Sequence, residues 1–442
     1  MPSTPRGRAV LACAALLAGC GPRAPATEAN DPAQNPLAVR NPRPERKLDA
    51  LGQFAPAVAE ARTSARLPEL DFIELSEGLP PSGTWVGRPL LFDLSGNGRT
   101  DLVASNCEED GYGCWSAPPG PGQPWALHVS DLPPHLGCGA VAALDLDRDG
   151  HADLVLSSKS GGLRLFLGDG QMNWRESPRS PLECPALGDL ARGDLDGDGI
   201  PDLVGIGCPA GGLVLLLGDG TGGLHLAPDT GLLPADEFGR DVELVDLDGD
   251  GRDDILVATS RGVRVFLTEK EAPLHWRELS EGLPAPRVPD SITSVCAGRF
   301  RADARPQIAV CSLPDTTLEL ARRDSIGVYA FVAERGRWEH VDSGLPRSER
   351  CHDLRAADLD GDGKLDLVVL SVESGAAIYL GDGQGAFRAK GRLRGVHGEG
   401  RLALGLVDEG TLPDIVVSSP GSREEPQAGG VRAFLNRGPI WR

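Results

Sequence analysis

The sequence predicts an all-β fold, a seven-bladed β-propeller built from four-stranded blades. Three observations lead to it: a composition rich in turn residues, an acidic loop motif that recurs along the chain, and an orphan strand at the start. The 442 residues include 58 Gly and 37 Pro but only 2 Met and 3 Tyr. This balance disfavours a helical bundle and favours many short strands joined by tight turns.

The recurring motif is nine residues long, with Asp at positions 1, 3, 5 and 9 and Gly at position 6, as in DLDRDGHAD from Asp145. Full copies begin at Asp145, Asp194, Asp246 and Asp358, a weaker copy begins at Asp93, and decayed copies begin at Arg299 and Leu406. Successive first positions are 48 to 59 residues apart, which gives seven units. Repeats of this period are typical of propellers and solenoids.

Each unit carries the same surroundings. An apolar stretch such as 141–144 precedes the loop, and a β-branched or Leu-rich stretch such as 367–370 follows it. A third strand comes next, as in 162–167, and a fourth often begins with Trp, as in WRELSEGLP from Trp276. Four short strands in about 50 residues predict one propeller blade.

The two ends of the repeat region complement each other. FIELSEGLP from Phe72 matches WRELSEGLP, yet no acidic loop precedes it, whereas the seventh unit ends soon after its third strand at 431–435. We therefore expect residues 71–76 to complete the last blade, with Phe72 in the place that Trp276 and Trp338 take in other blades. Closing the ring in this way removes two unpaired strand edges.

The acidic loops predict metal sites. Side chains at positions 1, 3, 5 and 9, together with the carbonyl of position 7, can converge on one point, and Gly at position 6 permits the sharp turn. The predicted ligands are Asp93, Ser95, Asn97 and Asp101; Asp145, Asp147, Asp149, His151 and Asp153; Asp194, Asp196, Asp198, Ile200 and Asp202; Asp246, Asp248, Asp250, Arg252 and Asp254; and Asp358, Asp360, Asp362, Lys364 and Asp366.

Flexible ligation by oxygen alone suits Ca²⁺, because Mg²⁺ requires stricter octahedral geometry and keeps more water. An EF-hand is excluded, since position 12 holds no Glu (Leu156 and Val369 stand there) and strands flank the loops. We expect a structural role for Ca²⁺, with four strong sites and one weaker site. In the fifth unit, a guanidinium in the cation's place beside Asp303 and simple decay of the loop both remain open.

These loops between two strands resemble the FG-GAP/VCBS repeat family, the calcium-loop propellers also found in integrin α-chain heads. The resemblance covers about 67–442 and implies a seven-bladed propeller with its metal loops on one face. The loops at Arg299 and Leu406 depart from the pattern, so the fifth and seventh blades are expected to bind no metal. Relatives of this kind include adhesion modules and enzyme accessory domains, so the resemblance implies little about function.

The N-terminus resembles a bacterial lipoprotein signal. Arg6 and Arg8 precede an apolar core at 9–17 that ends in Leu-Ala-Gly-Cys20, so residues 1–20 are predicted to be a signal with Cys20 lipidated. An ordinary cleaved signal is the alternative. Gly21 after the cysteine favours the outer membrane, and residues 21–66 are predicted to be a Pro/Ala-rich tether with a short helix at 51–62.

Eight cysteines follow the signal, an even number that favours disulfides in an exported domain. We expect them mostly at the ends of the blades opposite the acidic loops, with Cys107–Cys114 as the first pairing. Arg322, Arg323, Arg347, Arg350 and Arg355 form a local basic cluster on that side. It suits a carboxylate or sulfate ligand, or the arginines simply pair with neighbouring acids.

Charge and motifs narrow the function. The formal net charge is −20, and a surface this acidic disfavours nucleic acid. We find no H-E-x-x-H, G-x-S-x-G or phosphate-binding loop, and Cys351-His352-Asp353 is too contiguous for a catalytic triad. The chain is expected to be a monomeric, membrane-tethered binding or scaffold module for a protein or glycan. The alternative is a secreted lyase or hydrolase acting on polysaccharide or lipid.

Overall fold

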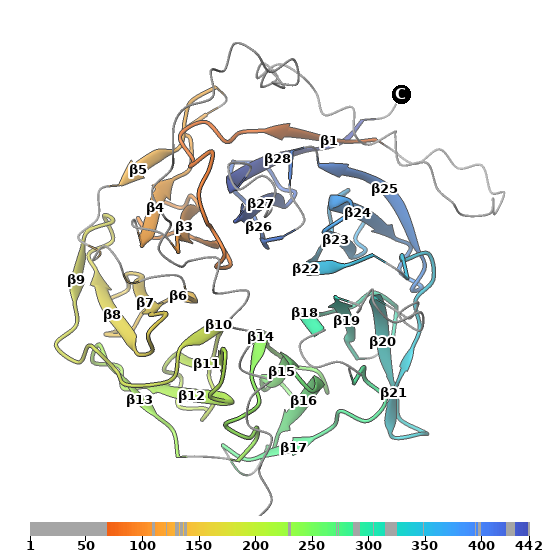
Figure 1. Ribbon diagram of the computed structural model, residues 1–442, viewed down its shortest axis with the longest axis horizontal. Coiled ribbons are helices and arrows are strands. Elements are labelled where there is room, and N and C mark those ends of the chain that lie inside the picture. Colours follow the sequence, from red (N-terminus) through yellow and green to blue (C-terminus); the bar gives the residue numbers. More distant parts are fainter. Residues whose placement is uncertain are drawn as a thin grey trace, which may run out of the picture.

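The computed structural model describes residues 69–440 except 108–110, 121, 129–131, 133–135, 137–138, 229–230, 271, 273, 286–291, 304, 314–324, 348, 394, 397–398 and 421–428. Its strands form seven four-stranded antiparallel sheets arranged as a ring (Figure 1). The predicted all-β, seven-bladed propeller is therefore confirmed. The predicted signal, Cys20, the tether and the helix at 51–62 lie outside the described residues.

In each of the first six blades, the strands follow in chain order from the innermost to the outermost. Blades one to three contain β2 Leu90–Phe92, β3 Asp101–Ser105, β4 Tyr112–Ser116 and β5 Ala126–His128; β6 Val141–Leu144, β7 Asp153–Ser157, β8 Leu163–Gly168 and β9 Trp174–Glu176; and β10 Leu187–Gly193, β11 Asp202–Gly207, β12 Leu213–Gly218 and β13 Leu224–Leu226.

Blades four to six contain β14 Gly239–Val245, β15 Asp254–Thr259, β16 Gly262–Thr268 and β17 Trp276–Glu278; β18 Ile292–Gly298, β19 Gln307–Ser312, β20 Ile326–Val332 and β21 Arg337–His340; and β22 Cys351–Ala357, β23 Asp366–Ser371, β24 Gly375–Gly381 and β25 Phe387–Leu393. Blade seven contains β26 Arg401–Gly405, β27 Asp414–Ser419, β28 Gly430–Ile440 and, as its outermost strand, β1 Glu69–Glu74.

The N-terminal strand closes the ring as the sequence predicts, two residues earlier than expected. Phe72 lies opposite Asn436 and Ile73 opposite Leu435 in the antiparallel pair of β1 and β28. Phe72 is fully buried, and its register position matches that of Trp276, which lies opposite Thr268 on β16. The first and last strands of the described chain are thus neighbours in one sheet.

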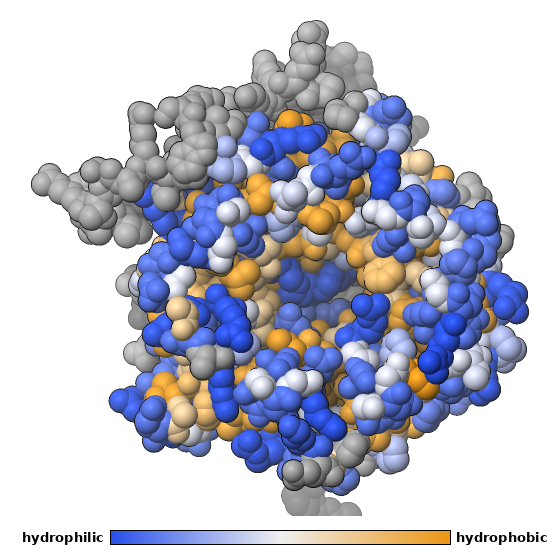
Figure 2. Space-filling model, turned by 180° about the vertical axis from the view of Figure 1, so that it is seen from behind, coloured by the Kyte–Doolittle hydropathy of each residue, from blue (hydrophilic) through white to orange (hydrophobic). Residues whose placement is uncertain are grey.

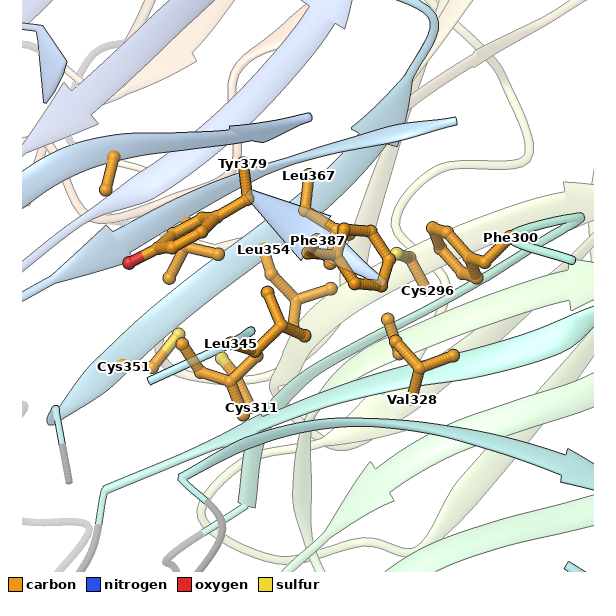
Figure 3. Packing of buried hydrophobic residues seen from close by; sticks show 14 residues of the cluster. Cys296, Phe300, Cys311, Val328, Leu345, Cys351, Leu354, Leu367, Tyr379 and Phe387 are labelled. Carbon is orange, nitrogen blue, oxygen red and sulfur yellow. The ribbon is translucent and has the colours of Figure 1, made fainter. Parts of the chain in front are cut away.

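Apolar side chains fill the spaces between neighbouring blades. The second strand of each blade is covered on both faces, which is why it reads as a continuous apolar run, as in β15 and β23, where every residue is buried. Figure 3 shows one such interface, where Phe300 of blade five meets Phe387 of blade six with ring centroids 5.9 Å apart. Every blade packs on two neighbours, so the loss of one blade would expose an apolar surface on each of the two blades beside it.

The cysteines correct one expectation. Cys107 is disulfide-bonded, but Cys114 is a free thiol, so the predicted Cys107–Cys114 pairing is wrong. The physical reason is that Cys114 belongs to β4 and points into the core beside Val103 and Leu154, away from the loop that holds Cys107. Cys184, Cys208, Cys296, Cys311 and Cys351 also form no disulfide in the described structure.

We predict that Phe72→Ala destabilises the protein by about 3–5 kcal/mol, because it empties a fully buried site at the ring closure. Chemical denaturation measures the change. Leu226→Ala is the matched control, since Leu226 lies on the outer strand of blade three and is 46% exposed; it should cost well under about 1 kcal/mol.

Deletion through residue 80 should cause aggregation through the uncovered edge of β28, whereas deletion through residue 66 should not. Equal melting of both truncations would contradict closure by β1.

Candidate metal loops and the central channel

The acidic loops each join the first strand of a blade to its second. In blade two the loop runs from Asp145, directly after β6, to Asp153, the first residue of β7. The Asp145 carboxylate accepts the N–H of Asp149 at 3.1 Å and of Gly150 at 3.0 Å. Gly150 has a φ of +87°, which explains glycine at position 6. The first side chain thus holds the sharp turn within its own loop.

The other motif copies repeat this geometry. The first-position carboxylate accepts the N–H of the sixth-position glycine in all of them, at 2.8 to 3.1 Å: Asp93 from Gly98, Asp194 from Gly199, Asp246 from Gly251, and Asp358 from Gly363. The Asp93 loop therefore has the same turn, although it offers Ser95 and Asn97 in place of two carboxylates.

The ninth-position aspartate is buried and links three segments of its blade. Asp153 accepts the N–H of Leu146, the second loop residue, at 2.7 Å and that of Gly168, at the end of the third strand, at 2.8 Å. Asp202, Asp254 and Asp366 make the same pair of hydrogen bonds in blades three, four and six. This residue is therefore a structural acceptor as well as a candidate ligand.

Burial changes the acidity of these ninth-position carboxyls. It raises the pKa of Asp153 and Asp202 to about 6 and that of Asp254 and Asp366 to about 7. Backbone N–H donors oppose the rise in each case, and the charges of neighbouring loop aspartates add to it. A bound cation would offset both burial and repulsion.

The loops bring three carboxylate oxygens together in four blades, all within 4.8 Å of one another. The four clusters are Asp145, Asp147 and Asp153; Asp194, Asp196 and Asp202; Asp246, Asp248 and Asp250; and Asp358, Asp360 and Asp366. Oxygens on opposite sides of a Ca²⁺ ion at 2.3–2.6 Å are about 5 Å apart, so these clusters have the size that Ca²⁺ requires.

The remaining predicted carboxylates lie outside these tightest clusters. Asp149, Asp198 and Asp362, at position 5, accept the N–H of position 7, namely that of His151, Ile200 and Lys364. In blade four, Asp250 also accepts the N–H of Arg252 and yet joins its cluster, while Asp254 does not. Position 5 thus braces the loop through one oxygen, and in blade six the other oxygen of Asp362 pairs with the Lys364 ammonium at 2.6 Å.

The two decayed loops hold ion pairs. In blade five, Arg301 lies 3.3 Å from Asp303, and Gln307 at position 9 accepts the N–H of Arg301 at 2.7 Å. In blade seven, Asp408 pairs with Arg437 at 3.0 Å. In blade five a guanidinium therefore lies beside Asp303, an arrangement compatible with both interpretations of this loop.

The basic cluster expected near blades five and six does not form one site. Arg347 pairs with Asp342 at 3.1 Å and Arg350 with Glu373 at 2.8 Å. Arg355 points instead toward the centre of the ring, 2.9 Å from Asp241. Arg322 and Arg323 lie outside the described residues.

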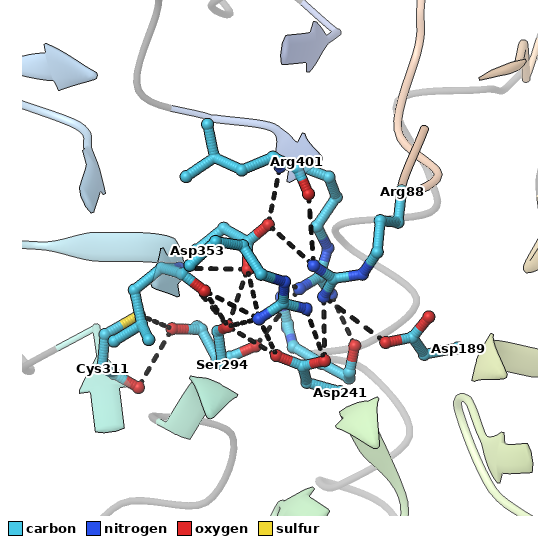
Figure 4. A network of polar contacts seen from close by, with 12 residues as sticks. Arg88, Asp189, Asp241, Ser294, Cys311, Asp353 and Arg401 are labelled. Atoms are coloured by element: carbon cyan, nitrogen blue, oxygen red, sulfur yellow. Dashed lines mark hydrogen bonds and ion pairs between the residues drawn. The ribbon is translucent and has the colours of Figure 1, made fainter. Parts of the chain in front are cut away.

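The centre of the ring holds a polar network that sequence reasoning missed (Figure 4). A positional signal could have found it, because the residue five places before each loop lies near the start of the innermost strand. In blades one to seven these residues are Arg88, Ala140, Asp189, Asp241, Ser294, Asp353 and Arg401. Two arginines in blades one and seven thus face three aspartates in blades three, four and six.

Arg88 reaches across the ring to all three aspartates, at 3.4 Å from Asp189, 2.8 Å from Asp241 and 3.3 Å from Asp353. Its burial works to lower the pKa of Arg88, but these three carboxylates raise it above its ordinary value. Asp241 and Asp353 are almost fully buried. Removing one member of such a group leaves an uncompensated buried charge.

The same side chains join neighbouring blades. Asp241 of blade four accepts the N–H of Val295 in blade five at 3.0 Å, and Asp353 of blade six accepts the N–H of Leu402 in blade seven at 2.7 Å. Ser294 donates to Asp353 from between them, at 2.6 Å. Seen from behind, the ring is hollowed at its centre, with hydrophilic side chains at the bottom of the hollow (Figure 2).

Cys351, His352 and Asp353 do not converge, as expected. Cys351 packs in the hydrophobic interface of blades five and six, whereas Asp353 points to the channel network. Within the described residues, no helix has the length and apolar character needed to cross a membrane.

Comparison with known proteins supports the prediction that the chain is built from repeats. The model of the FG-GAP-like repeat matches residues 93–156, 194–257 and 358–408. Each matched segment begins at the first position of an acidic loop, and the decayed loop at Arg299 falls outside them. No curated protein sequence matches the chain.

Solved structures share the architecture at low sequence identity. BBS1N, in complex with ARL6DN, is 11% identical with a TM-score of 0.51, over 84% of this chain and 97% of its own. An Agrocybe aegerita lectin that recognises non-reducing terminal N-acetylglucosamine is 14% identical with a TM-score of 0.45, over 74% and 91%. The V. cholerae biofilm matrix protein Bap1 is 11% identical with a TM-score of 0.47, over 85% and 91%.

At these identities the similarity concerns the fold alone. Of these three structures, BBS1N is the one that supports the fold, because its TM-score exceeds 0.5. The sequence motif, the loop geometry and the ring together lead to one conclusion: the chain carries FG-GAP-like repeats on a seven-bladed β-propeller.

Proposed function

We propose that the protein is a calcium-stabilised propeller that acts as a binding or scaffold module for a protein or a glycan. The observation that carries the proposal is the set of four clusters in which three carboxylate oxygens lie within 4.8 Å of one another. Each cluster comes from a single loop within one blade, so the metal's role is structural. The face at the other end of the blades is then left for the partner.

Calcium fits these loops better than other common cations. Hard carboxylate and carbonyl oxygens disfavour Zn²⁺, for which His and Cys are the usual ligands, and the wide, flexible loop suits the variable coordination of Ca²⁺ better than the octahedron of Mg²⁺. In this proposal Asp93, Ser95, Asn97 and Asp101 hold a fifth, weaker ion, because two carboxylates are replaced by neutral oxygens.

The binding role rests on the scaffold. A closed ring whose blades are joined at their edges and through the central channel is rigid, and rigid scaffolds position binding loops well. The strand ends opposite the acidic loops carry the longer connections, such as 313–325 between β19 and β20. We propose that this face contacts the partner.

A lipid on Cys20 would tether the propeller to the bacterial envelope, on the outer-membrane side that Gly21 favours. Cys20→Ser should then release the protein from the membrane fraction, measured by fractionation and by incorporation of labelled fatty acid. Continued membrane association of this variant would contradict a lipid as the anchor.

Calcium removal is predicted to destabilise the fold. EDTA should lower the melting temperature, and Ca²⁺ should restore it more effectively than Mg²⁺ at equal concentration. One site at about 100 times its dissociation constant contributes about 2.7 kcal/mol, so several sites should dominate stability. Metal analysis should give about four to five Ca²⁺ per chain. A melting curve unchanged by EDTA would disprove the structural role of the metal.

The effect of calcium should depend on pH. In the metal-free protein the raised pKa values of Asp153, Asp202, Asp254 and Asp366, about 6 to 7, exceed the unfolded value of about 3.9. The folded state then binds more protons than the unfolded chain, so metal-free stability falls as pH rises from about 4 to 7. The gap in melting temperature between Ca²⁺ and EDTA should therefore widen from pH 5 to pH 8. A constant gap would show that these carboxyls do not respond to the metal.

The binding role is tested by probing a soluble 67–442 fragment on a glycan array and in pull-down experiments. We expect a specific glycan or protein to be retained in Ca²⁺ and lost in EDTA, because the metal holds the strand ends in place. A folded, calcium-loaded fragment that retains no ligand in either format would contradict a binding function.

A further inference from the structure

A second repeat position, six residues before each loop, distinguishes three blades from the other four. It is glycine in blades one, two, three and seven: Gly87, Gly139, Gly188 and Gly400. A Cβ there would lie 2.0 Å from Ser105 Oγ at Gly87 and 2.1 Å from the Ser418 carbonyl oxygen at Gly400. Blades four, five and six instead carry Arg240, Thr293 and His352.

These three residues sit at irregularities of the innermost strands. The strand register shifts between Gly239 and Asp241, between Ile292 and Ser294, and between Cys351 and Asp353. Each shift leaves the residue between them unpaired in the ladder, as in a β-bulge, a feature that often re-aims a side chain. Arg240, Thr293 and His352 are therefore presented near the end of the channel that is opposite the acidic loops.

The Thr293 side chain makes a hydrogen bond within the described fold, whereas the side chains of Arg240 and His352 do not. Its hydroxyl donates to the Cys351 carbonyl oxygen at 2.8 Å. Within the described part of the chain, neither the Arg240 guanidinium nor the His352 imidazole makes a hydrogen bond or ion pair, and Arg240 Nε is buried without a partner. A buried polar group in this state can accept a partner such as a water molecule or an anion.

Arg240 takes no part in the ion pairs of the channel, to which Glu243 adds a fourth carboxylate. Arg88, Arg355 and Arg401 pair with Asp189, Asp241 and Asp353 at 2.8 to 3.8 Å. Arg240 has no carboxylate within ion-pair distance among the described residues. A partly buried guanidinium that has no ion-pair partner in the described structure suits an anion as its ligand.

Arg401 links the strand segments that carry the two unpartnered side chains. Its guanidinium donates to the backbone carbonyl oxygens of Arg240 at 2.7 Å and Thr293 at 3.3 Å. Thr293 in turn is bonded to Cys351, the residue before His352. Burial, and then the charges of Arg240, Arg401 and Arg350, lower the pKa of His352 to about 3. The imidazole is therefore neutral and offers one donor and one acceptor.

We propose that Arg240 and His352 form a binding site for a hydroxycarboxylate, such as the uronic acid of an acidic saccharide. The planar fork of Arg240 binds the carboxylate with two parallel hydrogen bonds. The neutral His352 binds an adjacent hydroxyl, which both donates and accepts. This inference deepens the proposed binding function and rests on it, because it names the ligand class of the same face.

The test uses the full chain, loaded with Ca²⁺, and three probes in calorimetric titration: galacturonate, galactose and acetate. Galacturonate carries both recognised groups, galactose only the hydroxyls, and acetate only the carboxylate. We expect galacturonate to bind at least about tenfold more tightly than galactose, which lacks the charge-assisted bonds to Arg240, and more tightly than acetate, which lacks the hydroxyl that His352 binds. Equal affinity for acetate and galacturonate would overturn the role of His352, and no binding of galacturonate would overturn the site.

Variants separate this site from general effects. Arg240→Ala and His352→Ala should each weaken galacturonate binding at least about tenfold with an unchanged melting temperature, since neither side chain supports the fold. His352→Gln, which keeps a donor and an acceptor, should retain most of the affinity. Arg175→Ala is the control, because Arg175 is exposed on β9 and unpaired in the described structure.

The outcome also distinguishes this inference from the broader one. If Arg240→Ala binds galacturonate as tightly as the parent protein, the site is wrong. If a ligand found on the array binds equally well to the parent protein and to Arg240→Ala, the binding function is supported and the Arg240 site is disproved. If no ligand of any class binds to the folded chain, both proposals fail together.

Discussion

Each acidic loop depends on one buried acceptor, the side chain at its ninth position. Asp153 shows the arrangement: one oxygen accepts a loop N–H and the other accepts an N–H of the third strand. Asp414 in blade seven has the same two partners, whereas Gln307 in blade five accepts only a loop N–H, that of Arg301. Removing a buried acceptor that has two backbone partners destabilises the fold. An acceptor is therefore still present at this position in blades whose loops lack the other metal ligands.

The ring and its centre follow from the blades that this acceptor holds in shape. Blade edges pack on one another through apolar side chains, and β1 supplies the last edge. At the axis, Asp241 and Asp353 bind the backbone of the next blade, while Arg88 balances their charge from the opposite side. The channel residues therefore lie near the start of the innermost strands, and the acidic loops follow the ends of the same strands. Each channel residue stands five positions before the first residue of its loop.

Much of this could be predicted from sequence because it is periodic. The loop spacing gives the blade count, and the match of Phe72 with Trp276 gives the closure. The channel was missed because its residues are alike in position and unlike in type: Arg88, Ser294 and Asp353 share no motif and meet only when the ring closes. The Cys107–Cys114 pairing failed for a related reason, since proximity in sequence says nothing about which face of a strand a thiol occupies.

The most direct test of this account compares Asp202→Asn with Asp196→Asn by chemical denaturation in EDTA and in Ca²⁺. Asp202 accepts two backbone N–H groups, and an amide in its place can accept only one, so we expect a loss of about 1–3 kcal/mol even without metal. Asp196, a third-position candidate ligand, should matter only in Ca²⁺. Equal stability of the two variants in EDTA would contradict the claim that the ninth-position acceptor, rather than the metal, shapes the loop first.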